Sequence, residues 1–150
     1  MSGKRPKLDD AFCRAAAMDF YAPKPELKRN AAYIDYGNEP GRFTAHLFNH
    51  SGAPWLSQKW AREVEQRTFG STGPDGFCED DDNGLAAATS VLLALGLFDI
   101  QGGAASQPVH EITSPVFDRV VINLEQHYYP GEHFIIEAEN NGPANCYIQS

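Results

Sequence analysis

The sequence has 150 residues, of which 42% are hydrophobic, with 12 basic and 20 acidic side chains and a formal net charge of −8. These values are typical of one globular domain with a single core, and the acidic balance disfavours nucleic-acid or anionic-membrane partners, which bind through Lys and Arg. No apolar run is long enough to span a membrane, and the basic start leads into Leu8-Asp9-Asp10, so no secretory signal is visible and the compartment stays undetermined.

The first expected helix covers Leu8–Phe20, where apolar residues recur at helical spacing. Pro23 and Pro25 should end this helix, because proline cannot continue the backbone hydrogen bonds. A second, short helix is expected over Phe43–His50. Its inward side chains should be Phe43, Leu47 and Phe48.

The third expected helix begins at Pro54, a residue that suits the first helical turn. Arg62 belongs to its charged outer faces. A fourth helix is expected over Leu85–Leu97, and its nearly uniform apolar composition predicts burial on most sides. The apolar face of the third helix consists of Leu56, Trp60 and Val64.

The pattern changes after Gly102-Gly103, where β-branched and aromatic residues become frequent. Turn residues separate the expected strands at Pro130-Gly131 and at 140–143. Helices followed by strands indicate a mainly α chain with C-terminal β-strands, divided into residues 1–103 and 104–150. The expected strands are Val109–Ile112, Val116–Leu124, His133–Glu137 and Cys146–Ile148.

Three cysteines stand far apart in the sequence, at Cys13, Cys78 and Cys146. An odd number without CxxC spacing argues against a disulfide framework and against a zinc site. One bridge remains open as an alternative, but we expect small, buried, apolar side chains.

The densest chemical feature is the run of four acids Glu79-Asp80-Asp81-Asp82, directly before the fourth expected helix. These side chains repel one another unless solvent, a cation or the helix dipole compensates. The simplest interpretation is a solvated turn that caps the helix. A calcium loop of the EF-hand type fails on spacing, because with Gly84 at the sixth position Ser90 stands where a bidentate Glu is needed. A third interpretation is a catalytic carboxylate that deprotonates a water.

Six short motifs along the chain resemble those of glycoside hydrolase family 92 in order and spacing. The first three resemble its GNEP signature, its GxPW…Q…VR helix and its PDG…D(D/E)DxG loop, and the others its LGFY, IGSPxF and NN…YIQS segments. They are Tyr36-Gly37-Asn38-Glu39-Pro40; Gly52-Ala53-Pro54-Trp55 with Gln58 and Arg62; Pro74-Asp75-Gly76 with Asp80-Asp81-Asp82-Asn83-Gly84; Leu95-Gly96-Leu97-Phe98; Ile112-Thr113-Ser114-Pro115-Val116-Phe117; and Asn140-Asn141 with Tyr147-Ile148-Gln149-Ser150.

The resemblance implies a calcium-dependent, inverting exo-α-mannosidase that acts on mannose-containing glycans. Members combine an N-terminal β-sandwich with an (α/α)6 barrel. Residues 1–103 would then be the last helices of the barrel, and residues 104–150 a closing β-segment packed on it.

The resemblance also implies roles for four residues. Asp82 would be the general base and Asp80 would help to hold the attacking water, since inversion needs a carboxylate on the water side of the scissile bond. Asn38 and Glu39 would lie near calcium and the sugar hydroxyls, and their oxygens are the hard ligands that calcium prefers.

The sequence departs from the family pattern at the proton donor. In the family this is a Glu in a Gly-Asn-aromatic motif before the GNEP signature, whereas Glu26, the one Glu before Tyr36, has different surroundings. We therefore expect activity to require missing N-terminal segments or another chain. Arg42 and Phe43 stand where many members have histidine, and His46 where they have an aromatic residue, which weakens the case for sugar contacts there.

Two alternatives to an enzyme component remain open: a non-catalytic protein that binds carbohydrate or calcium, and a purely structural remnant of the family. For Trp55 and Trp60, core packing is favoured over sugar stacking. None of the five histidines has the spacing of a metal motif, so structural or surface positions are expected for His46, His50, His110, His127 and His133.

Overall fold

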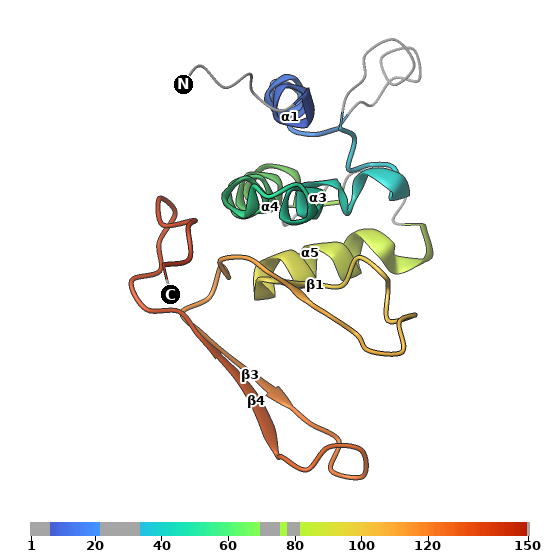
Figure 1. Ribbon diagram of the computed structural model, residues 1–150, viewed down its shortest axis with the longest axis vertical. Coiled ribbons are helices and arrows are strands. Elements are labelled where there is room, and N and C mark those ends of the chain that lie inside the picture. Colours follow the sequence, from blue (N-terminus) through green and yellow to red (C-terminus); the bar gives the residue numbers. More distant parts are fainter. Residues whose placement is uncertain (1–6, 22–33, 70–75, 78–81, 150) are drawn as a thin grey trace.

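The computed structural model describes residues 7–21, 34–69, 76–77 and 82–149. Helices come first and antiparallel strands last, as the sequence predicts, and a β-hairpin projects away from the stacked helices (Figure 1). The helices are α1 (Lys7–Ala16), α3 (Leu47–His50), α4 (Pro54–Thr68) and α5 (Leu85–Leu95), with the 3-10 turns η1 (Glu39–Gly41), η2 (Thr44–His46) and η3 (Asp82–Gly84).

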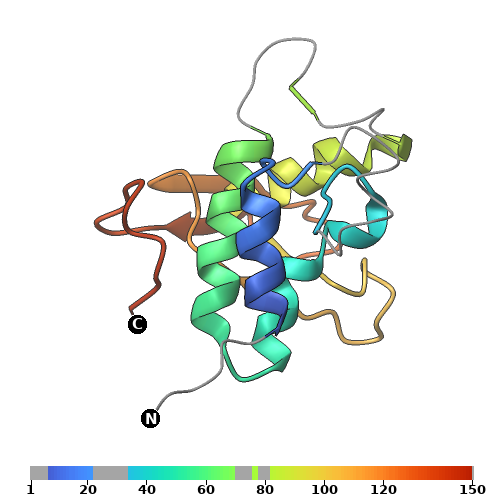
Figure 2. The same cartoon turned by 90° about the horizontal axis from the view of Figure 1, so that it is seen from above.

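The core lies where α1 packs against α4, which run alongside each other in Figure 2. Phe12 of α1 stacks on Trp60 of α4 with 5.1 Å between ring centroids. The indole Nε1 of Trp60 donates a hydrogen bond of 2.8 Å to the buried Asp9 carboxylate, so the polar atom of this core tryptophan has a partner. Other core side chains around this pair are Phe20, Tyr36, Phe48 and Val64.

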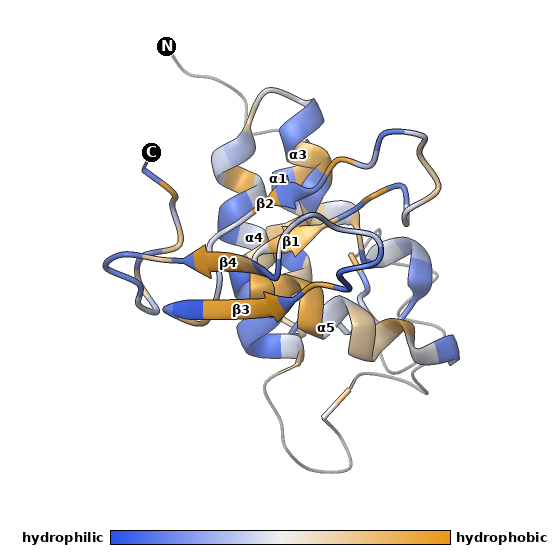
Figure 3. Ribbon diagram, turned by 90° about the horizontal axis from the view of Figure 1, so that it is seen from below, coloured by the Kyte–Doolittle hydropathy of each residue, from blue (hydrophilic) through white to orange (hydrophobic). Residues whose placement is uncertain are grey.

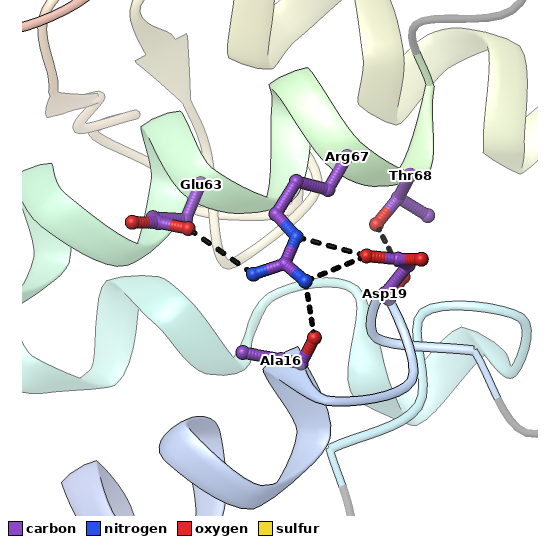
Figure 4. Close-up of polar contacts among 5 residues, drawn as sticks. All are labelled: Ala16, Asp19, Glu63, Arg67 and Thr68. Carbon is purple, nitrogen blue, oxygen red and sulfur yellow. Dashed lines mark hydrogen bonds and ion pairs between the residues drawn. The ribbon is translucent and has the colours of Figure 1, made fainter.

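The same two helices are also joined at the surface, as Figure 4 shows. The guanidinium of Arg67 on α4 lies 2.7 Å from the carboxylate of Asp19, and it also donates to the carbonyl oxygen of Ala16. The hydroxyl of Thr68 donates to the carbonyl oxygen of Asp19 at 3.0 Å. Because the side chains of Arg67 and Asp19 are 38% and 65% exposed, solvent screens their charges, and we expect this cluster to contribute about 1 kcal/mol or less to stability.

Helix α1 ends earlier than predicted and for a different reason. It stops at Ala16 rather than at the prolines, because Asp19 and Phe20 adopt left-handed conformations with φ of 50° and 59°. The turn returns Phe20 to the core, where it is fully buried, and its N–H donates to the Ala15 carbonyl oxygen at 3.0 Å.

The expected inward face of the 43–50 segment is only partly correct. Phe48 is fully buried, but Phe43 and Leu47 are each 37% exposed. Ala45 and His46 take the core positions instead. The cause is the 3-10 turn at the start of this segment, whose period of three residues shifts the inward face relative to an α-helix.

Helix α5 is less buried than its composition suggests. Ala86, Thr89 and Leu93 are buried, whereas Val91 is 57% exposed. The helix ends at Leu95, since Gly96 adopts a left-handed φ of 72°. Within the described part of the chain, no helix is both long and apolar enough to cross a membrane.

The strands form two separate antiparallel pairs. Strand β1 (Leu97–Phe98) pairs with β2 (Glu111–Ile112), although the sequence predicts the end of a helix there, with the LGFY-like motif. Strand β3 (Arg119–Asn123) pairs with β4 (His133–Glu137) in the hairpin. The strand expected at Cys146–Ile148 is irregular instead, and its backbone N–H at Ile148 donates to the Gln58 side chain at 2.9 Å.

The expectation of buried cysteines is wrong for Cys13, which is exposed on α1. Cys146 is partly buried, and both are free thiols. Cys78 lies outside the described residues.

Candidate functional site

The turn that carries Asn38 and Glu39 is built by short local contacts. Oδ1 of Asp35 accepts the Gly37 N–H at 3.0 Å, and η1 begins at Glu39 with Asn38 directly before it. A side chain at Gly41 would collide with the carbonyl oxygen of Asp35, so this position requires glycine. The turn leaves Asn38 exposed and Glu39 partly buried.

The acidic run leads into α5 through the turn η3, which begins at Asp82. Asn83 and Gly84 both adopt left-handed conformations, with φ of 57° and 75°, and redirect the chain into the helix. Helix α5 has no side-chain cap at its start, and such a terminus favours nearby negative charge. The side chain of Asp82 and all of Asp80 lie outside the described residues, so their roles stay predictions.

Figures 1 and 2 both place η1 and η3 at the same end of the molecule, where α5 begins. The backbones of the two segments that the resemblance assigns to the site therefore lie near each other. The roles of Asn38 and Glu39, like those of Asp80 and Asp82, stay predictions.

Three polar side chains close to η1 in the sequence are buried. The imidazole of His46 stacks on Phe98 with 4.3 Å between centroids, and burial lowers its pKa to about 4, so the ring is neutral at pH 7. Burial also raises the pKa of Tyr36 above its ordinary range, and its hydroxyl accepts the Ala45 N–H at 3.3 Å. Arg42 is 2% exposed, and its Nε and Nη1 have no hydrogen-bond partner among the described residues. His46 and Arg42 are thus buried away from any sugar in solution.

The described residues do not form a complete calcium site. Within residues 7–21, 34–69, 76–77 and 82–149, no group of three or more His, Cys, Asp or Glu side chains could hold a metal ion. Calcium takes 6–8 oxygen ligands. Asn38 and Glu39 fit calcium in the kind of donor and in their accessibility, but not in number.

The two tryptophans differ in their surroundings. Trp60 is buried, as expected, but the packing interpretation is wrong for Trp55, which is 54% exposed. Figure 2 shows the first turn of α4, where Trp55 lies, well away from η3, so this ring does not belong to the candidate site. The histidines other than His46 are exposed, and His50 lies 3.2 Å from Glu111.

Sequence reasoning missed the role of Arg62, which it placed on an outer face of its helix. Arg62 is 6% exposed, and its Nη2 donates to the Ser114 Oγ at 2.8 Å and to the Pro115 carbonyl oxygen at 2.6 Å. A longer contact of 3.5 Å reaches Oδ1 of Asn141. One turn earlier on α4, Gln58 holds the backbone of Ile148. All of these residues belong to the motifs that resemble the family. Their membership in the motifs was the one sign in the sequence that could have pointed to these contacts.

A cavity of about 770 Å³ lies at this junction, between the C-terminal end of α5 and the C-terminal segment. Its lining includes Gly96, Thr113, Ile136, Asn140 and Tyr147. Helix α5 has 11 residues, so the cavity and η3 are at opposite ends of a helix of about 16 Å. The cavity is therefore distinct from the place where the acidic run enters α5.

A model of the glycosyl hydrolase family 92 catalytic domain matches residues 4–150, which is nearly the whole chain. No match was found among curated proteins.

Proposed function

Because this chain belongs to glycosyl hydrolase family 92, we propose that it supplies the water-activating side of a calcium-dependent, inverting exo-α-mannosidase. The observation that carries the proposal is the acidic run that enters α5 through η3, at the same end of the molecule as Asn38 and Glu39. The helices would be the last ones of an (α/α)6 barrel, and the strands its closing segment.

Asp82 acts as the general base in this proposal. It accepts a proton from water while the water oxygen attacks the anomeric carbon of the terminal mannose, and the bond to the leaving oxygen breaks on the opposite face. Asp80 accepts a hydrogen bond from the same water and orients it. The product is β-mannose, since attack from the opposite face inverts the configuration.

The leaving oxygen also needs a proton. No motif in this sequence matches the family's proton donor, and Glu26 lies outside the described residues. We place the donor on a preceding segment of the parent protein or on another chain. A substrate whose leaving group departs without protonation should therefore bypass this requirement.

Asn38 and Glu39 would hold calcium together with hydroxyls of the sugar. When bound, calcium would favour the distorted ring of the transition state. Calorimetry of the full chain with calcium alone tests this assignment. Glu39→Gln should weaken calcium binding about tenfold or more, because it removes a charged ligand, whereas Glu125→Gln, on an exposed turn, should leave it unchanged.

The decisive assay compares two substrates with calcium present. The chain should release 2,4-dinitrophenol from its α-mannoside but should leave α-1,2-mannobiose intact, and proton NMR should detect β-mannose as the first product. Comparable turnover of both substrates would contradict an absent proton donor. First formation of α-mannose would contradict inversion.

A non-catalytic mannose- or calcium-binding protein is the alternative. The exposed position of Asn38 favours it equally, because an accessible amide can bind a sugar hydroxyl without any catalysis. Calcium-dependent binding of mannose without release of dinitrophenol would support this alternative and reject the enzymatic one. Absence of both binding and turnover would leave a purely structural role.

A further inference from the structure

The hairpin of β3 and β4 is an apolar, exposed element with two free edges. Figure 1 shows it projecting from the helices, and Figure 3 shows its strands as mainly hydrophobic. Val121, Phe134 and Ile135 are 40%, 48% and 46% exposed, and no other strand among the described residues pairs with either edge. A two-stranded hairpin is marginally stable in water, whereas three or more strands with an apolar face are stable. Within the part of the chain that the structure describes, this hairpin therefore has no third strand beside it.

Two backbone hydrogen bonds, one at each end of the hairpin, determine which backbone groups face the free edges. Leu124 N–H donates to the Glu132 carbonyl oxygen at 2.9 Å, and Ala138 N–H donates to that of Asp118 at 2.9 Å. Pairs with inward groups alternate with pairs whose groups point outward. In the register of this hairpin, the N–H and C=O groups of His133, Ile135 and Glu137 must therefore point away from β3.

We propose that two copies of this chain pair antiparallel along β4, with the two-fold axis at Ile135. This register places the outward groups of Ile135 opposite those of Ile135 in the second copy. It also places His133 opposite Glu137 of the second copy, and Glu137 opposite His133. Each of these pairs can exchange both backbone hydrogen bonds, so every outward group of β4 finds a partner.

The side chains in this register are complementary as well. An imidazole N–H can donate to the facing Glu137 carboxylate, which lies 2.9 Å from Arg119 within its own hairpin. The result is a row of alternating donors and acceptors across four strands. The two-fold axis repeats this polar row on the other side of Ile135. Between the two polar rows, Val121 and Ile135 of both copies form one continuous apolar row.

The free edge of β3 fits a second copy less well. The equivalent two-fold pairing about Val121 would place Arg119 opposite Asn123, which leaves the charge of Arg119 without an opposite charge across the new edge. Pairing through β4 is therefore favoured over pairing through β3.

Proline substitutions separate the two edges. Ile135→Pro removes an outward N–H of β4, and Val121→Pro removes an outward N–H of β3, so neither breaks the β3–β4 ladder. In sedimentation velocity over a range of concentrations, the full chain should dimerise. Ile135→Pro should raise the dimer Kd about 10- to 100-fold, whereas Val121→Pro should leave it unchanged.

Charge variants provide an independent arm that leaves the backbone intact. Glu137→Lys places a lysine opposite His133 of the second copy, and His133→Glu places a glutamate opposite Glu137, so each variant alone should dimerise about tenfold more weakly. Mixed in equal amounts, the two variants should form a heterodimer, because the lysine introduced in one chain then faces the glutamate introduced in the other. Arg119→Gln, which removes the ion pair within the hairpin but not the β4 edge, should still dimerise.

Each outcome decides the proposal. A monomer at all concentrations would overturn it, as would an association that survives Ile135→Pro or is lost with Val121→Pro. Failure of the mixed charge variants to associate would overturn the register. Circular dichroism and cooperative thermal unfolding of each variant show that any loss of the dimer occurs in a folded chain.

Discussion

The Nη2 atom of Arg62 lies 2.8 Å from the Oγ atom of Ser114, across a buried contact between α4 and the segment before β3. Arg62 also binds the carbonyl oxygens of Ser114 and Pro115 at 3.2 and 2.6 Å. One guanidinium thus satisfies several buried acceptors and joins the helical part of the chain to the β-strand part. Arg62 belongs to a matched motif, and the contacts it makes here are structural.

Replacement of Arg62 by methionine should lower the free energy of unfolding by about 2–4 kcal/mol. The change leaves the buried carbonyl oxygens of Ser114 and Pro115 without a donor. Urea unfolding followed by circular dichroism measures the loss. Arg67→Met is the matched control on the same helix, and it should cost about 1 kcal/mol or less, because Arg67 and Asp19 pair at the surface. Equal losses for both variants would contradict the buried role of Arg62.

Gly96 is the second position where a small change should have a large effect. Its φ of 72° is left-handed, and a Cβ atom there would collide with the Thr113 carbonyl oxygen and lie 2.9 Å from the Pro115 nitrogen. Gly96→Ala should therefore lower stability by about 3 kcal/mol. Gly52→Ala is the control, since Gly52 has a similar φ of 76° but nothing within 4 Å of the added atom. The control should lose about 1 kcal/mol, from backbone strain alone.

His46 should make the stability of the chain depend on pH between about 6.5 and 4. Burial lowers its pKa from 6.5 to about 4, so the folded state favours the neutral ring. Above pH 6.5 the ring is neutral in both states and contributes no slope. As pH falls below 6.5 the unfolded chain binds a proton first, and stability declines by about 3 kcal/mol until the folded state also protonates near pH 4.

The variant His46→Phe tests this dependence, because it retains a ring against Phe98 and removes the titrating group. Urea midpoints at several pH values between 7 and 4 should decline less steeply than those of the unchanged chain. His50→Gln removes a largely exposed histidine and should keep the original slope. Identical slopes for His46→Phe and the unchanged chain would reject the assignment.

Asp82→Asn should reduce turnover of the dinitrophenyl α-mannoside by about 10²- to 10⁴-fold, the usual contribution of a general base. Asp80→Asn should reduce kcat by less, because a residue that orients water does not itself take the proton. Asp118→Asn, at an exposed position before β3, should retain full activity. Undiminished turnover by Asp82→Asn would remove this residue from the mechanism.

Local sequence patterns predicted most of the helices and their order along the chain, but fewer of the residues at which the helices begin and end. The spacing of Trp60 and Val64 predicted the buried face of α4, because helical periodicity is a local property. The end of α1 was missed because Asp19 and Phe20 turn back in left-handed conformations to reach the core. No local pattern announces such a turn when the residue involved is a phenylalanine.

The sequence by itself determined the family, the order of helices before strands, and the candidate residues Asn38, Glu39, Asp80 and Asp82, since motifs and periodicity are written in the chain. The tertiary structure decided which polar residues are structural. Arg62 and Ser114 stand 52 positions apart, and only folding brings a guanidinium to buried carbonyl oxygens at that distance along the chain. A side chain is buried when residues of another segment pack over it, and in this chain those residues come from segments far away in the sequence.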